Sequence, residues 1–372
     1  MTELDLARMT LVIGLVIAAF IYQRTRLVSG GLMTPAYLAI VISAGTWSDV
    51  WGWIGLTLAS WIVFKLVVYF VALPKAWLLM IAIGISTLLH AVLVLSTGGK
   101  GIHETVSVGA FQLIVSGGMY LTPGLTAFDL ARQGWLRTIS VIVGATVVTL
   151  ALTYIVKTIG TASGPLEPRI PPVSEVFTGM SLPVAMIVCV LLAEGMRIGF
   201  GWGSGGIIGA VFFVELLDWA NFIVIIVLVA ITAIAAHFAR RILIMSPRQW
   251  FQFTMILGAL IAWGGLLVGS ALGIDAAKQV GAYALEPLLA VGLISTDVAR
   301  FGTRRTIYGK LVVLAGVILT NELVKTGGFA SWVALAGVLF AVISIYIFAF
   351  REVRQGWRVA EDLGSRHPLI TS

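Results

Sequence analysis

Long runs of apolar residues, separated by short polar stretches, follow one another along the whole chain. Eight of these runs are long enough to cross a bilayer as straight helices, which takes about 20 residues: 50–72, 76–96, 137–157, 179–196, 219–239, 249–270, 306–324 and 329–350. A further run, 6–23, is slightly shorter, and its basic residues follow it, which favours an uncleaved first span over a signal peptide. The pattern predicts an all-α polytopic membrane protein.

Four other apolar segments are too short or too interrupted to be straight spans. They are 28–45, with Gly30, Gly31 and Pro35; 107–131, with Pro123 and Gly124; 203–217, with Gly205 and Gly206; and 280–299, with Pro287. Where a helix is broken at membrane depth, the backbone N–H and C=O groups that lose their helical hydrogen bonds must face protein or a water-filled cavity. We therefore predict broken or re-entrant helices at these places, and about 13 membrane crossings in all.

Three short motifs occur twice, in the same order, once in each half of the chain. They are Ser29-Gly30-Gly31 and Ser204-Gly205-Gly206; Pro74-Lys75-x-Trp77 and Pro247-Arg248-x-Trp250; and Pro123…Asp129-x-Ala131-Arg132-x-Gly134-x-x-Arg137-Thr138 and Pro287…Asp297-x-Ala299-Arg300-x-Gly302-x-x-Arg305-Thr306. The last motif has four extra residues between Pro and Asp in its second copy. Repetition of this kind indicates an internal duplication.

The duplication divides the chain into four parts. Residues 1–157 form the first repeat unit, and residues 179–325 form a second, diverged unit. A Pro-rich external linker, 158–178, joins them, and residues 326–372 add one more transmembrane helix and a basic cytoplasmic tail. Each unit has six predicted crossings, so both face the same way. We predict a parallel repeat with a pseudo-two-fold axis along the membrane normal.

Composition and charge agree with a membrane protein. The chain is 59% hydrophobic and 11% charged, which is too little charge for a soluble protein of 372 residues. With the N-terminus outside, 17 of the 24 Lys and Arg residues are cytoplasmic, six are external and Lys65 lies within a span. We therefore predict a multi-pass protein of the cytoplasmic membrane with a cytoplasmic C-terminus. The net charge of +7 then reflects topology, and no motif for nucleic-acid binding accompanies it.

The repeated Asp and Arg residues are the first candidate site. Asp and Arg three positions apart share one helix face and can pair. One interpretation is a cap at the end of a span with an anchor at the headgroups. The other is an inward-facing polar site or a docking surface for a partner, where two half-motifs converge on the pseudo-two-fold axis. The candidate residues are Asp129, Arg132, Arg137, Asp297, Arg300 and Arg305.

Glu286 is the second candidate, because an acidic group at membrane depth is costly and indicates a function. It directly precedes Pro287, and the first half has Thr122 there. Glu194 and Glu215 are interpreted as interface residues. We find no P-loop, no dinucleotide fingerprint, no metal-ligand spacing and no catalytic triad, so we expect no metal, no cofactor and no catalytic residue. Nucleotide chemistry would then belong to another chain.

At these motifs the sequence resembles the C subunit of the bacterial capsule poly-γ-glutamate synthase. That family carries Gly-Leu-x-x-Pro-Gly-Tyr-Leu after its first span. The equivalent stretch here, residues 31–38, reads GLMTPAYL. The stretch 120–138, YLTPGLTAFDLARQGWLRT, is similar to the family's later Val-Pro-Gly-Leu-Ile-Ala-Asn…Gln-Gly-Leu segment. The resemblance covers nearly all of 1–157 and is weaker in the second half, so the chain is identified as a tandem fusion of two family units.

The resemblance implies a non-catalytic membrane subunit of a complex that makes and exports an anionic γ-linked glutamate polymer. The implied partners are a cytoplasmic ATP-dependent amide ligase and an anchored accessory subunit. Two alternatives remain open. One is a secondary transporter of a small solute, with a midplane site at the broken helices. The other is a membrane anchor for a partner that forms no passage.

Overall fold

The computed structural model describes residues 3–43, 47–70, 75–96, 112–159, 181–203, 219–282 and 285–326. These residues form helices and no strand, which confirms the all-α prediction for this part of the chain. The helices are α1 (Glu3–Thr25), α2 (Thr34–Ser43), α3 (Trp47–Phe70), α4 (Lys75–Ser96), α5 (Gln112–Gln133), α6 (Trp135–Ile159), α7 (Ser181–Phe200), α9 (Trp219–Ile242), α10 (Pro247–Ala271), α11 (Asp275–Ala282), α12 (Glu286–Phe301) and α13 (Thr303–Thr326).

Six of these helices, α1, α3, α6, α9, α10 and α13, are long and apolar enough to cross a membrane. The pair α11 and α12 counts as a seventh span if its bend of 98° lies within one crossing. The chain is therefore a helical membrane protein, and the count of 13 crossings stays a prediction. The predicted break at 203–217, the linker and the last span lie wholly or mainly outside the described residues.

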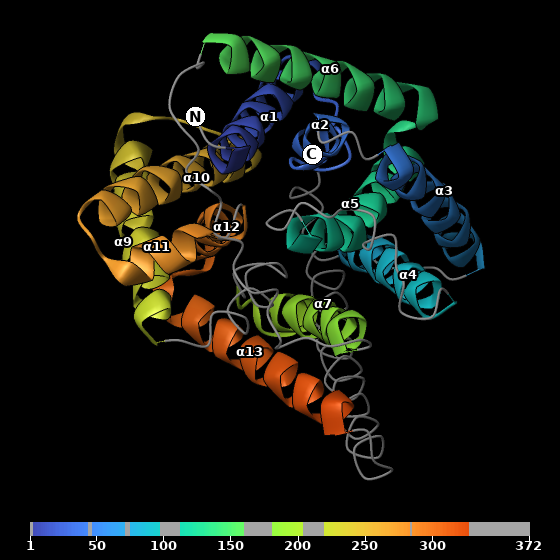
Figure 1. Cartoon of the computed structure of the whole chain (residues 1–372). Coiled ribbons are helices and arrows are strands. Elements are labelled where there is room, and N and C mark those ends of the chain that lie inside the picture. Colours follow the sequence, from blue (N-terminus) through green and yellow to red (C-terminus); the bar gives the residue numbers. More distant parts are fainter. Residues whose placement is uncertain are drawn as a thin grey trace, which may run out of the picture.

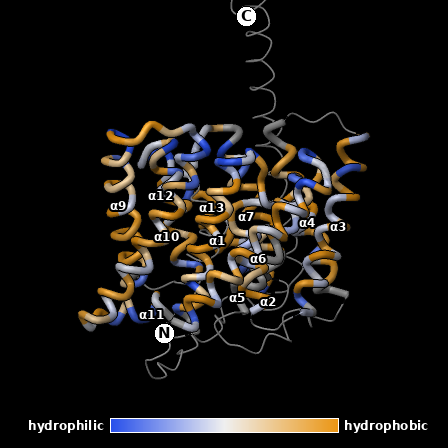
Figure 2. The backbone as a smooth tube through the Cα atoms, turned by 90° about the horizontal axis from the view of Figure 1, so that it is seen from above, coloured by the Kyte–Doolittle hydropathy of each residue, from blue (hydrophilic) through white to orange (hydrophobic). Residues whose placement is uncertain are grey.

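The helices stand side by side in one layer. Figure 2 shows hydrophilic residues gathered toward the two faces of this layer and hydrophobic residues between them. Figure 1 shows α3, α6, α9 and α13 at the outside of the molecule and α5 and α12 nearer its centre. In agreement, only 22% of the most apolar stretch of α9 is buried, against 44% of the corresponding stretch of α1. The outer helices therefore present their apolar side chains to lipid.

The same set of helix contacts occurs in each half. In the first half α1 packs on α6, while α3, α4 and α5 pack on one another. In the second half α7 packs on α13, while α9, α10 and α12 pack on one another. The contacts between the halves also form a pair, α1 with α10 and α7 with α4. A duplication would produce this pattern, and the duplication itself stays a prediction.

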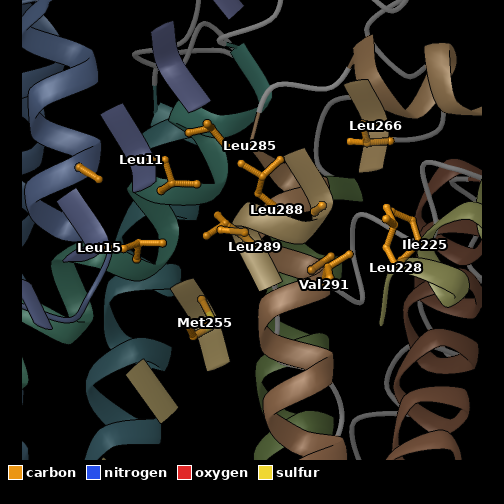
Figure 3. Close-up of a cluster of buried hydrophobic side chains, with 14 of the residues drawn as sticks. Leu11, Leu15, Ile225, Leu228, Met255, Leu266, Leu285, Leu288, Leu289 and Val291 are labelled. Carbon is orange, nitrogen blue, oxygen red and sulfur yellow. The ribbon is translucent and has the colours of Figure 1, made fainter. Parts of the chain in front are cut away.

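A shared core of buried side chains joins the two halves. Leu11 and Leu15 of α1 belong to the same cluster as Met255 of α10 and Leu288 and Leu289 of α12 (Figure 3). Lipid is as apolar as these side chains, so close van der Waals packing rather than water exclusion holds the helices together.

Two of the expected helix breaks are present, and one is not. Gly30 and Gly31 have φ of 70° and 90° and separate α1 from α2, which carries Pro35 in its first turn. Pro287 lies in the first turn of α12, just after the break from α11. The prediction was wrong for Pro123, which lies inside the continuous helix α5. Packing against neighbouring helices can offset the hydrogen bond that a proline removes.

The predicted orientation can be tested at two exposed sites at opposite ends of α10. Ile244 precedes this helix and Asp275 follows it, and its 25 residues extend about 37 Å. In a Cys189→Ser background, we expect Ile244→Cys to react with a membrane-impermeant maleimide only after the membrane is opened. Asp275→Cys should react in intact cells. Labelling of both sites from one side would show that α10 does not cross.

Candidate functional site

A cavity of about 540 Å³ lies between the two halves of the molecule. Its walls come from α1, the turn at 28–33, α2, α4 and α5 of the first half, and from α7, α10 and α12 of the second. The volume falls in the usual range for ligand-binding cavities. Most of the lining is apolar, so the few charged groups in it determine what it can bind.

Helices α5 and α12 present equivalent faces to this cavity. The lining residues are Leu121, Leu125, Asp129 and Arg132 on α5, and Leu289, Leu293, Asp297 and Arg300 on α12. Steps of four, four and three residues place each set on one side of its helix. The structure thus brings both copies of the Asp-Arg pair to one cavity, although 168 positions separate them in the sequence.

Asp129 is held mainly by the broken segment of its own half. It is 4% exposed, and its Oδ2 accepts the Gly31 N–H at 3.3 Å. The positive φ of Gly30 and Gly31 turns this stretch of backbone toward the carboxylate. Arg132 is a looser partner, with Nη2 3.7 Å from Oδ1. Asp129 thus pairs with Arg132, as the spacing predicted, and it also anchors the helix break.

In both halves, residues of the Asp-Arg motif or next to it also contact the segment at the Ser-Gly-Gly motif. Gln133 accepts the Val28 N–H at 2.8 Å and donates to the Val28 carbonyl at 3.2 Å. In the second half, Gly203 lies so close to Asp297 and Phe301 that a Cβ on it would be 2.8 Å and 2.7 Å from their side chains. In each half, the Asp-Arg motif therefore packs on residues at or just before the Ser-Gly-Gly motif.

The Gly and Thr of the doubled motif form the turns between helices. Gly134 and Gly302 have φ of 88° and 87°, a conformation that glycine adopts without strain. Thr138 and Thr306 donate from Oγ1 to the carbonyls of these glycines at 2.9 Å and 3.0 Å. Two functions are therefore combined in the motif. Asp and Arg line the cavity, while Gly and Thr set the helix-to-helix turn.

Arg137 and Arg305, which were also candidate residues, do not line the cavity. Both are exposed in the first turns of α6 and α13. Their exposure agrees with the interpretation as topology anchors. Arg132 and Arg300 are also exposed, but they line the cavity, and this separates the two pairs.

Two further arginines, which were not among the candidate residues, reach the cavity. Arg197 of α7 donates from Nε to Glu194 at 2.6 Å, and both residues line the cavity. Arg248 of α10 stacks over the ring of Tyr22 of α1, 4.1 Å from its centroid. A signal existed for the first, because Glu194-x-x-Arg197-x-Gly199 has the spacing of the doubled motif. Glu194, interpreted as an interface residue, belongs to this wall.

These groups share one end of the cavity, which we call the arginine mouth. It comprises Arg132, Arg197, Arg248 and Arg300 with Asp129, Glu194 and Asp297. Helix α10 runs from Arg248 toward α11, which lies at the lower face in Figure 2, so the mouth is at the opposite face. At this end of the cavity, four guanidinium groups stand against three carboxylates among the described lining residues. This excess of positive charge favours an anionic ligand.

Glu286 lines the same cavity at its other end. It precedes Asp297 by eleven residues on α12, about 16 Å along the helix. The side chain is 6% exposed, and its Oε2 accepts the Leu285 N–H at 3.1 Å. Its Oε1 has no hydrogen-bond partner within the described part of the chain. Among the described lining residues, Glu286 is thus the charged group away from the arginine mouth.

The described residues contain no group of three or more His, Cys, Asp or Glu that could hold a metal ion. Gly205 and Gly206, the predicted helix break of the second half, lie outside the described residues.

Comparison with known proteins assigns the first half of the chain. Residues 13–139 match the family described as Capsule biosynthesis CapC, and this range holds the first broken segment and the first copy of the Asp-Arg motif. No curated protein and no solved structure shows significant similarity to the chain. The tandem arrangement stays a prediction. Over residues 13–139 this helical membrane protein is thus similar to the capsule biosynthesis CapC family.

Proposed function

We propose that this chain is a membrane subunit of a poly-γ-glutamate synthesis and export complex, and that it supports a separate ATP-dependent amide ligase. The family match supports a role in capsule biosynthesis. The arginine mouth supports an anionic product, because guanidinium groups bind carboxylates through two parallel hydrogen bonds. Poly-γ-glutamate carries one free carboxylate in each unit. The observation that carries the proposal is the convergence of Arg132 and Arg300 on one cavity.

We further propose that the two halves are a tandem of equivalent units around this cavity. The repeated helix contacts support this. So does a pair of glycines, Gly124 and Gly292, each five residues before its Asp. A Cβ on Gly124 would lie 2.7 Å from the Ala82 carbonyl oxygen, and one on Gly292 would lie 3.0 Å from the Met255 carbonyl oxygen. When residues are counted from Asp, Gly292 is therefore the counterpart of Gly124 in the second half, whereas counting from the prolines gives Leu288.

The partners follow from the same proposal. A cytoplasmic ligase and an anchored accessory subunit would contact the face that carries the arginine mouth. In the proposed orientation this is the cytoplasmic face of the cytoplasmic membrane, where the ligase finds ATP and glutamate.

The test is reconstitution of the full chain with and without the ligase. We expect polymer only when ligase, chain and ATP are present together, and no ATP hydrolysis by the purified chain. Polymer formed by the ligase alone at the same rate would contradict the proposal. Uptake of radiolabelled glutamate by vesicles that contain only this chain would instead support the transporter, which the buried Glu286 at a helix break also favours.

A further inference from the structure

Three side chains that line the cavity each carry a buried polar atom without a hydrogen-bond partner among the described residues. They are the Tyr37 hydroxyl, Gln252 Oε1 and Glu286 Oε1, on side chains that are 5%, 4% and 6% exposed. A buried polar atom that makes no hydrogen bond is destabilising, so native structures seldom keep one. Three around one cavity indicate a ligand that brings hydrogen-bond donors into it.

The two ends of the cavity have opposite charge. The arginine mouth has an excess of guanidinium groups, as described above. Near Glu286, by contrast, Asp5 and Glu286 are two carboxylates with one guanidinium, Arg8, in electrostatic reach of both. Arg8 also donates to the Gly281 carbonyl, and Asp5 accepts the Trp263 indole N–H at 3.3 Å. The end at Glu286 therefore suits a cation, and the mouth suits anions.

We infer that the cavity binds the amino-terminal end of a γ-linked glutamate oligomer, with the terminal ammonium at Glu286 and carboxylates at the arginine mouth. The inference rests on the proposed function and names the part of the polymer that is recognised. The two charged ends lie about 16 Å apart along α12. One α-linked residue spans at most about 3.6 Å, so a free amino acid is too short and an oligomer is required.

The cavity wall between the two ends suits the same ligand. Leu121, Leu125, Leu289 and Leu293 are apolar, and each γ-linked unit has two methylene groups to place against them. Its amide N–H can donate to Gln252 or Tyr37. An anionic phospholipid also suits the arginines and the leucines, but its acyl chains carry no donor for Glu286. The three unpartnered polar atoms therefore favour the oligomer.

The test compares two probes on the purified full chain in nanodiscs of zwitterionic lipid. One is a γ-linked glutamate oligomer with a free amino terminus, and the other is its N-acetylated form. We expect acetylation to weaken binding by about 10- to 100-fold, because it removes a charge-assisted hydrogen bond. Glu286→Gln should remove this preference, so that both probes bind equally. Asp275→Asn removes a carboxylate that is 86% exposed outside the cavity and should keep the preference. Thermal unfolding checks that both variants fold.

Each other outcome overturns the inference in a distinct way. Equal binding of the two probes by the unchanged chain overturns the role of Glu286 but leaves the proposed function, which polymer formation with the ligase tests separately. Retention of an anionic phospholipid, released by Arg132→Lys with Arg300→Lys and not displaced by the oligomer, would assign the cavity to lipid.

Discussion

Replacing Arg132 and Arg300 together by lysine should reduce polymer yield at least about tenfold, although the charge of the chain is unchanged. Lysine keeps the positive charge but loses the planar guanidinium that holds a carboxylate through two hydrogen bonds. A hydrogen bond to a charged group contributes about 1.5–3 kcal/mol, and one such bond is lost at each site. The measurement is polymer yield with the co-expressed ligase, together with pull-down of the ligase.

The matched control is the double change Arg137→Lys and Arg305→Lys. These residues belong to the same two motif copies and are exposed like Arg132 and Arg300, but they do not line the cavity. The positive-inside rule counts charge and ignores shape, so yield should stay near that of the unchanged chain. Equal yields from the two double variants would show that the cavity arginines act only as topology anchors. Membrane insertion is compared in parallel.

Replacing Gly258 by alanine should destabilise the second half by about 1–3 kcal/mol, since overpacking of a filled core is costly. A Cβ on Gly258 would lie 2.5 Å from the Cα of Gly292, so α10 and α12 would have to move apart. Backbone atoms on the opposite helix cannot rotate away as a side chain can. Because α12 carries Asp297 and Arg300, polymer yield should fall together with the midpoint of thermal unfolding in detergent.

Gly264→Ala, on the same helix, is the control for this change. A Cβ there meets nothing within 4 Å among the described residues. Alanine is about 1 kcal/mol more favourable than glycine inside a helix, so this variant should be as stable as the unchanged chain or more stable. If the two alanine variants unfold at the same temperature, the close approach of α10 and α12 does not hold the cavity together.

The helical class and most span boundaries could be predicted because they depend on local properties. A run of about 20 apolar residues must form a helix in lipid, since no water is present to satisfy its backbone. For this reason α3, α9 and α10 begin and end within three residues of the predicted runs. The break at Gly30 and Gly31 is equally local, because positive φ is a property of glycine itself.

Pro123 in α5 is a position at which the local sequence predicted the wrong structure. In water a proline inside a helix costs about 3 kcal/mol, which predicts a break at Pro123. The outcome depended on what surrounds the helix. Gly124 lets the backbone of α4 approach so closely that a Cβ would be 2.7 Å from Ile83 Cα, and α5 remains one helix. No pattern within residues 107–131 contains that information.

The sequence by itself determined a helical membrane protein, the doubled motif, the CapC resemblance of the first half and Asp129, Arg132, Asp297 and Arg300 as candidates. These follow from apolar run length and from repeated spacing, which are visible along one chain. Only the tertiary structure decided that Arg197 and Arg248 share a cavity with these residues, and that Arg137 and Arg305 do not. The physical reason is that a cavity wall is formed by helices far apart in sequence. Their crossing and close approach depend on packing between side chains that no single segment encodes.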